Sequence, residues 1–170
     1  METYKVKTVD KSLSGTVVVP GSKSMTNRAL LLAALSEEEA ILQGVLFSDD
    51  SRHFLDCLVT LGYKLDINET EKTVKLQGCG RNIPNKFAKI NVGSAGTAAR
   101  FITAMLALSD GGYEIGCSEQ MEKRPMEELF KVLTDMGAQF TYLKEEGHLP
   151  VRVKGNGGIC KDINMDISKS

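Results

Sequence analysis

The sequence predicts an α/β protein built from two similar units in tandem. The first observation behind this prediction is a repeat: Gly21-Ser22 is followed by Arg28, and Gly93-Ser94, 72 residues later, is followed by Arg100 at the same distance. The second is that segments typical of strands alternate with segments whose apolar residues recur every three or four positions, as in helices. This repeat is longer than the common solenoid repeats, so it indicates duplicated α/β units.

The first unit is predicted to run strand, helix, strand, helix, strand, strand. Its opening strand is the β-branched run Thr16–Val19, which ends at Pro20. We expect a helix after Gly21 that continues through the apolar residues 29–35, then a short strand, and then an amphipathic helix over 52–58 that stops at Gly62. Residues 64–67 and 73–76 alternate as strands and form the closing hairpin.

The second unit repeats this order. A strand at 89–92 precedes a helix that includes residues 100–108, a second helix covers 125–133 and stops at Gly137, and hairpin strands follow at 139–142 and 151–153. Residues 163–168 echo residues 89–94 and begin a third copy, where the sequence stops. We therefore expect this chain to be a fragment of a longer protein.

The composition excludes several classes of function. The chain has 170 residues, of which 42% are hydrophobic and 25% charged, as in globular proteins with a core of their own. A net charge of −1 disfavours a nucleic-acid partner. The four cysteines form no CxxC pair and only two histidines are present, which disfavours a metal site. No apolar run is long enough for a membrane span, and we expect a cytoplasmic protein with reduced thiols.

The segment Gly21–Arg28 is the leading candidate for a binding site. Lys23 and Arg28 add positive charge at a helix start, where the helix dipole is already positive. That charge is unfavourable for the helix alone but suits a bound anion such as phosphate. In the alternative interpretation, Ser22 caps the helix and the arginine makes a surface ion pair.

The second copy permits both interpretations as well. Around Gly96 its small residues could serve close packing, with Ser94 as the helix cap and Arg100 in a surface ion pair. Arg124 precedes Pro125, which we expect in the first turn of a helix, so the arginine either faces that helix start or lies in a solvated loop.

Three further residues have plausible structural roles. Asp49 and Asp50 are predicted to cap a helix, with the alternative that one of their carboxylates orients Lys23 or Arg28. Cys117 has no histidine near it in the sequence, so we interpret it as a passive thiol.

Together, four motifs carry a resemblance that covers nearly the whole chain. They are Gly21-Ser22-Lys23-Ser24-x-x-Asn27-Arg28, Ser48-Asp49-Asp50, Gly96-Thr97-Ala98-x-Arg100, and Met121-x-x-Arg124-Pro125 with Leu129. In this order and spacing they resemble the 5-enolpyruvylshikimate-3-phosphate synthase family, also called 3-phosphoshikimate 1-carboxyvinyltransferase.

The resemblance implies the enolpyruvyl transferase fold, in which each of two domains contains three βαβαββ units. Residues 1–19 would then be a strand segment of the other domain, and 20–170 an incomplete N-terminal domain with units at about 20–85 and 86–160 and the start of a third at 161–170. The implied reaction transfers the carboxyvinyl group of phosphoenolpyruvate to the 5-hydroxyl of shikimate 3-phosphate, a step toward chorismate and the aromatic amino acids. It requires no metal and no organic cofactor.

The resemblance also implies site residues. Shikimate 3-phosphate would contact Lys23, Ser24, Arg28 and Ser170, and phosphoenolpyruvate would contact Lys23, Gly96 and Arg124. Lys23 would be catalytic, with support from Asp50, Ser94, Thr97 and Arg100. The acid and base carboxylates of the family lie in its second half, so we expect this chain to be inactive without that partner.

The chain departs from the family pattern at three positions. Ser94 replaces a common asparagine and Phe101 a common proline; in the family both positions flank the phosphoenolpyruvate pocket, so glyphosate sensitivity does not follow from the resemblance. Cys117 replaces an aspartate or similar residue. Related UDP-N-acetylglucosamine enolpyruvyl transferases carry a cysteine closer to the Arg-Pro pair, and asparagine where this chain has Ser24. An enzyme of that type is the second interpretation, and a non-catalytic phosphate-binding module is the third.

Overall fold

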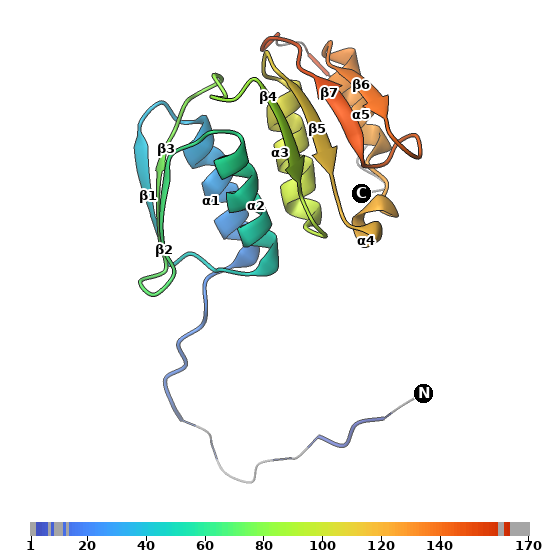
Figure 1. Ribbon diagram of the computed structural model, residues 1–170. Coiled ribbons are helices and arrows are strands. Elements are labelled where there is room, and N and C mark those ends of the chain that lie inside the picture. The colour runs from blue at the N-terminus through green and yellow to red at the C-terminus, as the bar shows by residue number, and fades with distance from the viewer. Residues whose placement is uncertain (1–2, 7, 9–11, 13, 160–161, 164–170) are drawn as a thin grey trace.

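The computed structural model describes residues 3–6, 8, 12, 14–159 and 162–163 (Figure 1). Its first unit consists of two helices and three strands: α1 (Lys23–Leu35), β1 (Glu39–Gln43), α2 (Asp49–Thr60), β2 (Leu65–Asn68) and β3 (Thr73–Gln77). Gly62 follows the end of α2 with a φ of +88°, which matches the predicted glycine stop.

The second unit contains the same elements with one strand and one short helix added. It comprises β4 (Phe87–Asn91), α3 (Gly96–Ala107), β5 (Gly112–Gly116), α4 (Glu119–Glu122), α5 (Glu127–Asp135), β6 (Gln139–Tyr142) and β7 (Val151–Lys154). The predicted α/β fold class, both long helices of each unit and both hairpins are confirmed. The one-turn helix α4, which Ser118 caps, was not predicted.

The two sheets have matching topologies. The second sheet has the order β4-β5-β7-β6, in which β4 runs parallel to β5 and the other neighbours are antiparallel. The first has the order β1-β3-β2, antiparallel throughout. Strands β1, β3 and β2 therefore correspond to β5, β7 and β6, and within the described residues the first sheet has no counterpart of β4.

The predicted strand at Thr16–Val19 is wrong for this structure. These residues form no strand, and the side chains of Val17 and Val18 are 83% and 89% exposed. A strand is stable only when its backbone groups pair with a neighbour, and no described strand lies beside this run. That residues 1–19 belong to another domain stays a prediction, and most of the predicted third copy lies outside the described residues.

Helices α1, α2 and α3 lie between the two sheets and share one core (Figure 1). Leu30 of α1, Phe54 and Leu58 of α2, and Ile102 and Leu106 of α3 are each fully buried. The amino-terminal ends of these helices point to the same end of the molecule, where α4 also lies (Figure 1). The duplicated fold thus gathers several helix starts at one end.

Three of the predicted helix starts need correction. Ala95 rather than Ser94 occupies the cap position of α3, because the turn at Gly93 places Ser94 one residue too early. Ser48 caps α2 by accepting from the Ser51 N–H, so the adjacent aspartates fall in the first turn. Helix α5 begins at Glu127, after a cap at Met126, and Pro125 therefore precedes the helix.

Candidate functional site

The start of α1 is fixed by close contacts with the rest of the first unit. Ser22 caps the helix by accepting from the Met25 N–H at 3.4 Å. Gly21 lies directly against the carbonyl of Gly44, so a Cβ at this position would overlap backbone. Of the motif's hydroxyls, Thr26 accepts from the Leu46 N–H at 3.1 Å. Glycine is therefore required at position 21 to bring α1 against the loop that precedes α2.

Lys23 and Asp50 form an ion pair between the first turns of α1 and α2. Lys23 Nζ lies 3.0 Å from Asp50 Oδ2, and the aspartate is the more buried partner, with 19% of its side chain exposed against 51% for the lysine. This ion pair matches the alternative interpretation of the two aspartates, in which one carboxylate orients Lys23. The ammonium keeps enough exposure to meet a ligand at the same time.

Arg28 lies one turn further along α1 and is held by two contacts. Its Nη1 donates to the Ser24 carbonyl at 3.1 Å, and its Cζ lies 5.9 Å from the centre of the Phe101 ring on α3. The ring face attracts the guanidinium, so Phe101 of the second unit holds an arginine of the first. Sequence reasoning noted Phe101 only as a departure from the family pattern and missed this contact.

Gly96, Arg100 and Arg124 come together at the start of α3. A Cβ at Gly96 would lie 2.7 Å from Arg124 Nη1 and 3.3 Å from Arg100 Nη1. Arg100 donates to the carbonyls of Gly96 and Pro125, each at 3.2 Å. Arg100 thus ties the first turn of α3 to the loop that carries Arg124, and this loop places a cation over the helix start.

The other predicted site residues are less fully constrained. Ser24 is exposed, and Ser94 and Thr97 are half-buried around the start of α3. Ser170 lies outside the described residues. Asn27 belongs to the same motif as Lys23 but is fully buried, and neither polar atom of its amide has a hydrogen-bond partner within the described part of the chain. The assignments of individual residues to ligands stay predictions.

The site is suited to binding anions rather than to nucleophilic catalysis. It offers the side chains of Lys23, Arg28 and Arg124 together with the N–H groups of helix starts, which are the donors that phosphates and carboxylates require. Cys117 is nearby in the sequence, but burial raises the pKa of its thiol to about 11, which leaves it protonated near neutral pH. This agrees with its interpretation as a passive thiol.

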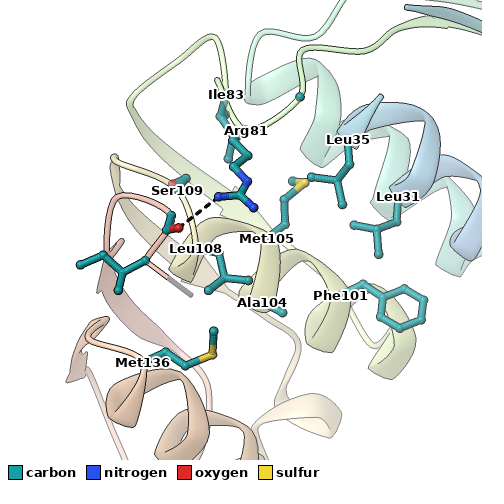
Figure 2. A pocket seen from close by; sticks show the side chains of 13 residues that line it. Leu31, Leu35, Arg81, Ile83, Phe101, Ala104, Met105, Leu108, Ser109 and Met136 are labelled. Atoms are coloured by element: carbon teal, nitrogen blue, oxygen red, sulfur yellow. Dashed lines mark hydrogen bonds between the residues drawn. The ribbon is translucent and has the colours of Figure 1, made fainter. Parts of the chain in front are cut away.

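An apolar pocket of about 270 Å³ lies beside this site, between α1, α3 and the turn at Gly158 (Figure 2). Leu31, Leu35, Met105 and Leu108 are among its lining residues, and Arg81 Nη1 donates to the Gly158 carbonyl at 3.1 Å. Most of this lining is hydrocarbon, so the pocket lacks the converging donors that a phosphate requires.

Comparison with known proteins identifies the family. The family model described as EPSP synthase (3-phosphoshikimate 1-carboxyvinyltransferase) matches residues 7–170. The chain belongs to the EPSP synthase family. The match favours this family over the UDP-N-acetylglucosamine enolpyruvyl transferases and agrees with the resemblance carried by the four motifs.

Relatives and solved structures agree with the EPSP synthase assignment. The chain is 40% identical over 155 residues to the 3-phosphoshikimate 1-carboxyvinyltransferase of Trichormus variabilis, covering 91% of this chain and 36% of the relative. It is 46% identical over 146 residues to that of Pseudoalteromonas atlantica, covering 85% and 34%. An EPSP synthase structure from Acinetobacter baumannii matches with a TM-score of 0.75 and 27% identity, over 84% of this chain and 32% of that one.

A more distant structure shares the fold alone. The enolpyruvyl transferase NikO from Streptomyces tendae matches with a TM-score of 0.56 and 14% identity, over 86% of this chain and 31% of that one. The chain spans about a third of the length of the relatives and structures it matches. Among the residues that the structure describes, no helix has the length and apolar character needed to cross a membrane.

Proposed function

We propose that this chain supplies the phosphate-binding part of a 3-phosphoshikimate 1-carboxyvinyltransferase. In the net reaction, the 5-oxygen of shikimate 3-phosphate bonds to C2 of phosphoenolpyruvate, the bond from C2 to the phosphate oxygen breaks, and the hydroxyl proton is balanced by the released phosphate. The products are 5-enolpyruvylshikimate 3-phosphate and phosphate. A cytoplasmic location and a place on the route to chorismate belong to the same proposal.

The observation that carries this proposal is that Lys23 and Arg28 lie on the first two turns of α1, and Arg124 lies over the first turn of α3, at the same end of the fold (Figure 1). Lys23 is fixed by Asp50 at 3.0 Å, and Arg124 lies over Gly96. Both substrates carry a phosphate and a carboxylate, so they require several cations in fixed positions. Surface charges that serve only solubility need no fixed positions, whereas Lys23 is held by Asp50 and Arg124 lies over Gly96.

The two helix starts divide the substrates between them. Shikimate 3-phosphate binds at α1 through Lys23, Ser24 and Arg28, and phosphoenolpyruvate binds at α3 through Gly96 and Arg124, with Lys23 reaching both. These groups orient the substrates and neutralise charge on the phosphate that leaves. The acid and base groups come from the remainder of the enzyme, which this chain requires as its partner.

Complementation in trans tests the proposal. The chain is mixed with the part of the Trichormus variabilis relative that it does not cover, and release of phosphate from both substrates is measured. Turnover that requires both pieces supports the proposed enzyme. Normal turnover by this chain alone would overturn the expectation that it is inactive by itself.

Titration of the chain alone separates the enzyme from a binding module. We expect shikimate 3-phosphate to shift the amide signals of Lys23 and Ser24 in 1H–15N spectra, and Lys23→Ala and Arg28→Ala to abolish those shifts without unfolding the chain. Unchanged shifts in both variants would refute the site. Binding without turnover in the complemented mixture would favour a non-catalytic phosphate-binding module.

A further inference from the structure

The first two turns of α2 contact both candidate binding regions. Asp50 and His53 are three residues apart and so share one face of the helix. Asp50 pairs with Lys23 of the first unit at 3.0 Å. The His53 imidazole lies against the backbone of Gly93 in the second unit, so closely that a Cβ at Gly93 would overlap the ring. One helix of the first unit therefore contacts Lys23 and the loop that leads to Gly96.

The loop that His53 contacts is itself well ordered by hydrogen bonds. Gly93 has a φ of +57°, its N–H donates to Asn91 Oδ1 at 2.8 Å, and its carbonyl accepts from the Ser118 N–H at 3.0 Å. One turn after His53, the Cys57 thiol donates to the Asn91 carbonyl at 3.4 Å. Two successive turns of α2 thus rest on the residues that immediately precede the α3 start.

We propose that His53 is a positioning residue, which sets the place of the Gly93–Gly96 loop relative to Lys23 and so determines how phosphoenolpyruvate meets both. The inference rests on the proposed function, in which Lys23 and Gly96 contact the same ligand. His53 contacts the backbone of Gly93 and acts on the ligand only through it. Binding groups must be placed to within a fraction of an ångström. Removing this contact therefore lowers the affinity for the ligand that contacts both units, phosphoenolpyruvate.

A purely structural role for His53 predicts a different pattern. Loss of packing alone would lower the stability of the fold and reduce the affinities for both substrates to the same extent. If His53 is a positioning residue, its removal lowers the affinity for phosphoenolpyruvate selectively. Shikimate 3-phosphate is less affected because it binds at α1, on the other side of the His53 contact. The ratio of the two affinities therefore separates the two roles.

The test compares His53→Ala with His53→Gln in the full 170-residue chain, with His148→Ala as the control because His148 lies in a hairpin loop of the second unit. We expect His53→Ala to move the amide signals of Gly93 to Gly96 in 1H–15N spectra. It should raise the Kd for phosphoenolpyruvate about tenfold at saturating shikimate 3-phosphate, and change the Kd for shikimate 3-phosphate less than twofold. Glutamine, which restores a polar side chain of similar reach, should recover most of the affinity.

Several outcomes would overturn the proposal. They are loop amides that do not move, equal weakening of both substrates, or a glutamine variant no better than alanine. If His53→Ala does not fold, His53→Leu replaces it as the variant without a polar side chain, and a leucine variant that binds phosphoenolpyruvate as tightly as the glutamine variant overturns the proposal. If the unsubstituted chain binds neither substrate, the proposed function fails, and the effect of His53 on the loop is judged from the spectra alone.

Discussion

The starts of α1 and α3 are copies of one structural device, and they acquire positive charge in different ways. Helix α1 carries Lys23 and Arg28 in its own sequence, and Ser22 occupies one of its free N–H groups. Helix α3 begins with small residues, and its cap position, Ala95, makes no side-chain hydrogen bond within the described part of the chain. Its own cation, Arg100, donates to the carbonyls of Gly96 and Pro125, and a second cation, Arg124, comes from the loop between α4 and α5.

This difference teaches how duplication can divide one binding task. A helix start with its own cations binds mainly through side chains, and its glycine serves close packing, as at Gly21. A helix start without a side-chain cap leaves its N–H groups open to an anion, and its glycine leaves room for the ligand, as proposed for Gly96. We therefore expect side-chain substitutions to have the larger effect in the first unit and backbone-directed substitutions in the second.

Removing one cation from each unit is the most direct test of whether the two helix starts bind the substrates differently. In the complemented enzyme, Lys23→Ala should lower kcat/KM by at least about 100-fold, because this ammonium faces both substrates in the proposed site. Arg124→Ala should raise the KM for phosphoenolpyruvate and leave the Kd for shikimate 3-phosphate within twofold. Lys131→Ala on the exposed face of α5 is the control. An equal effect of Arg124→Ala on both substrates would show that the units do not divide the ligands.

Gly96→Ala tests whether the second start binds through its backbone. The added Cβ would lie 2.7 Å from Arg124 Nη1, so the guanidinium or the ligand must move. We expect about a tenfold rise in the KM for phosphoenolpyruvate and little change in the melting temperature. Gly112→Ala is the matched control, because its Cβ would meet Phe87 at an ordinary 3.4 Å. An unchanged KM in the Gly96 variant would remove the proposed role of this glycine.

The fold was largely predictable because its signals are local. Apolar periodicity and glycine stops located α2 and α5, and alternation located both hairpins. The strand at Thr16–Val19 was predicted by the same local signal and is absent, because a strand depends on a neighbour that its own sequence does not describe. The sequence spacing also did not predict that Ala95 and Met126, rather than polar residues, occupy the cap positions of α3 and α5.

The candidate site was predictable only in its motif residues. Lys23, Gly96 and Arg124 stand out by type and spacing, and the structure brings the last two together. Phe101 and His53 act across the interface between units, so no pattern within one unit reveals their partners. A search for half-buried polar or aromatic residues one turn from a motif residue could have marked both, since His53 lies three residues after Asp50 and Phe101 lies four residues after Thr97.

Phe101→Leu probes how far the second unit supports the first. The ring lies 5.9 Å from Arg28 Cζ, and an exposed contact of this type contributes about 0.5–1 kcal/mol, which corresponds to roughly a two- to fivefold change in affinity. We expect the Kd for shikimate 3-phosphate to rise by that factor, as measured by titration of the chain. Leu129→Ala, on α5 and outside this contact, is the control. A change confined to phosphoenolpyruvate would instead assign Phe101 to the second start.

The smallest predicted effect is a loss of folding stability at alkaline pH, caused by the Cys57 thiol at the contact between the units. Burial of Cys57 between α2 and β4 raises the pKa of its thiol to about 12, from an ordinary value of 9.0. The folded chain then retains a proton that the unfolded chain loses, so stability is full below about pH 9 and falls as the pH rises toward 12. The pKa of buried Tyr63 is raised as well and acts in the same direction.

Urea unfolding at pH 7 and at about pH 10.5 measures this alkaline loss of stability. Cys57→Ala should be less stable than the unsubstituted chain at pH 7, because it leaves a small cavity between the units, but it should lose less stability on going to the higher pH. Tyr63→Phe provides the comparison for the phenol. An alkaline loss that is the same with and without Cys57 would mean that this thiol is not what makes the contact between the two units sensitive to pH.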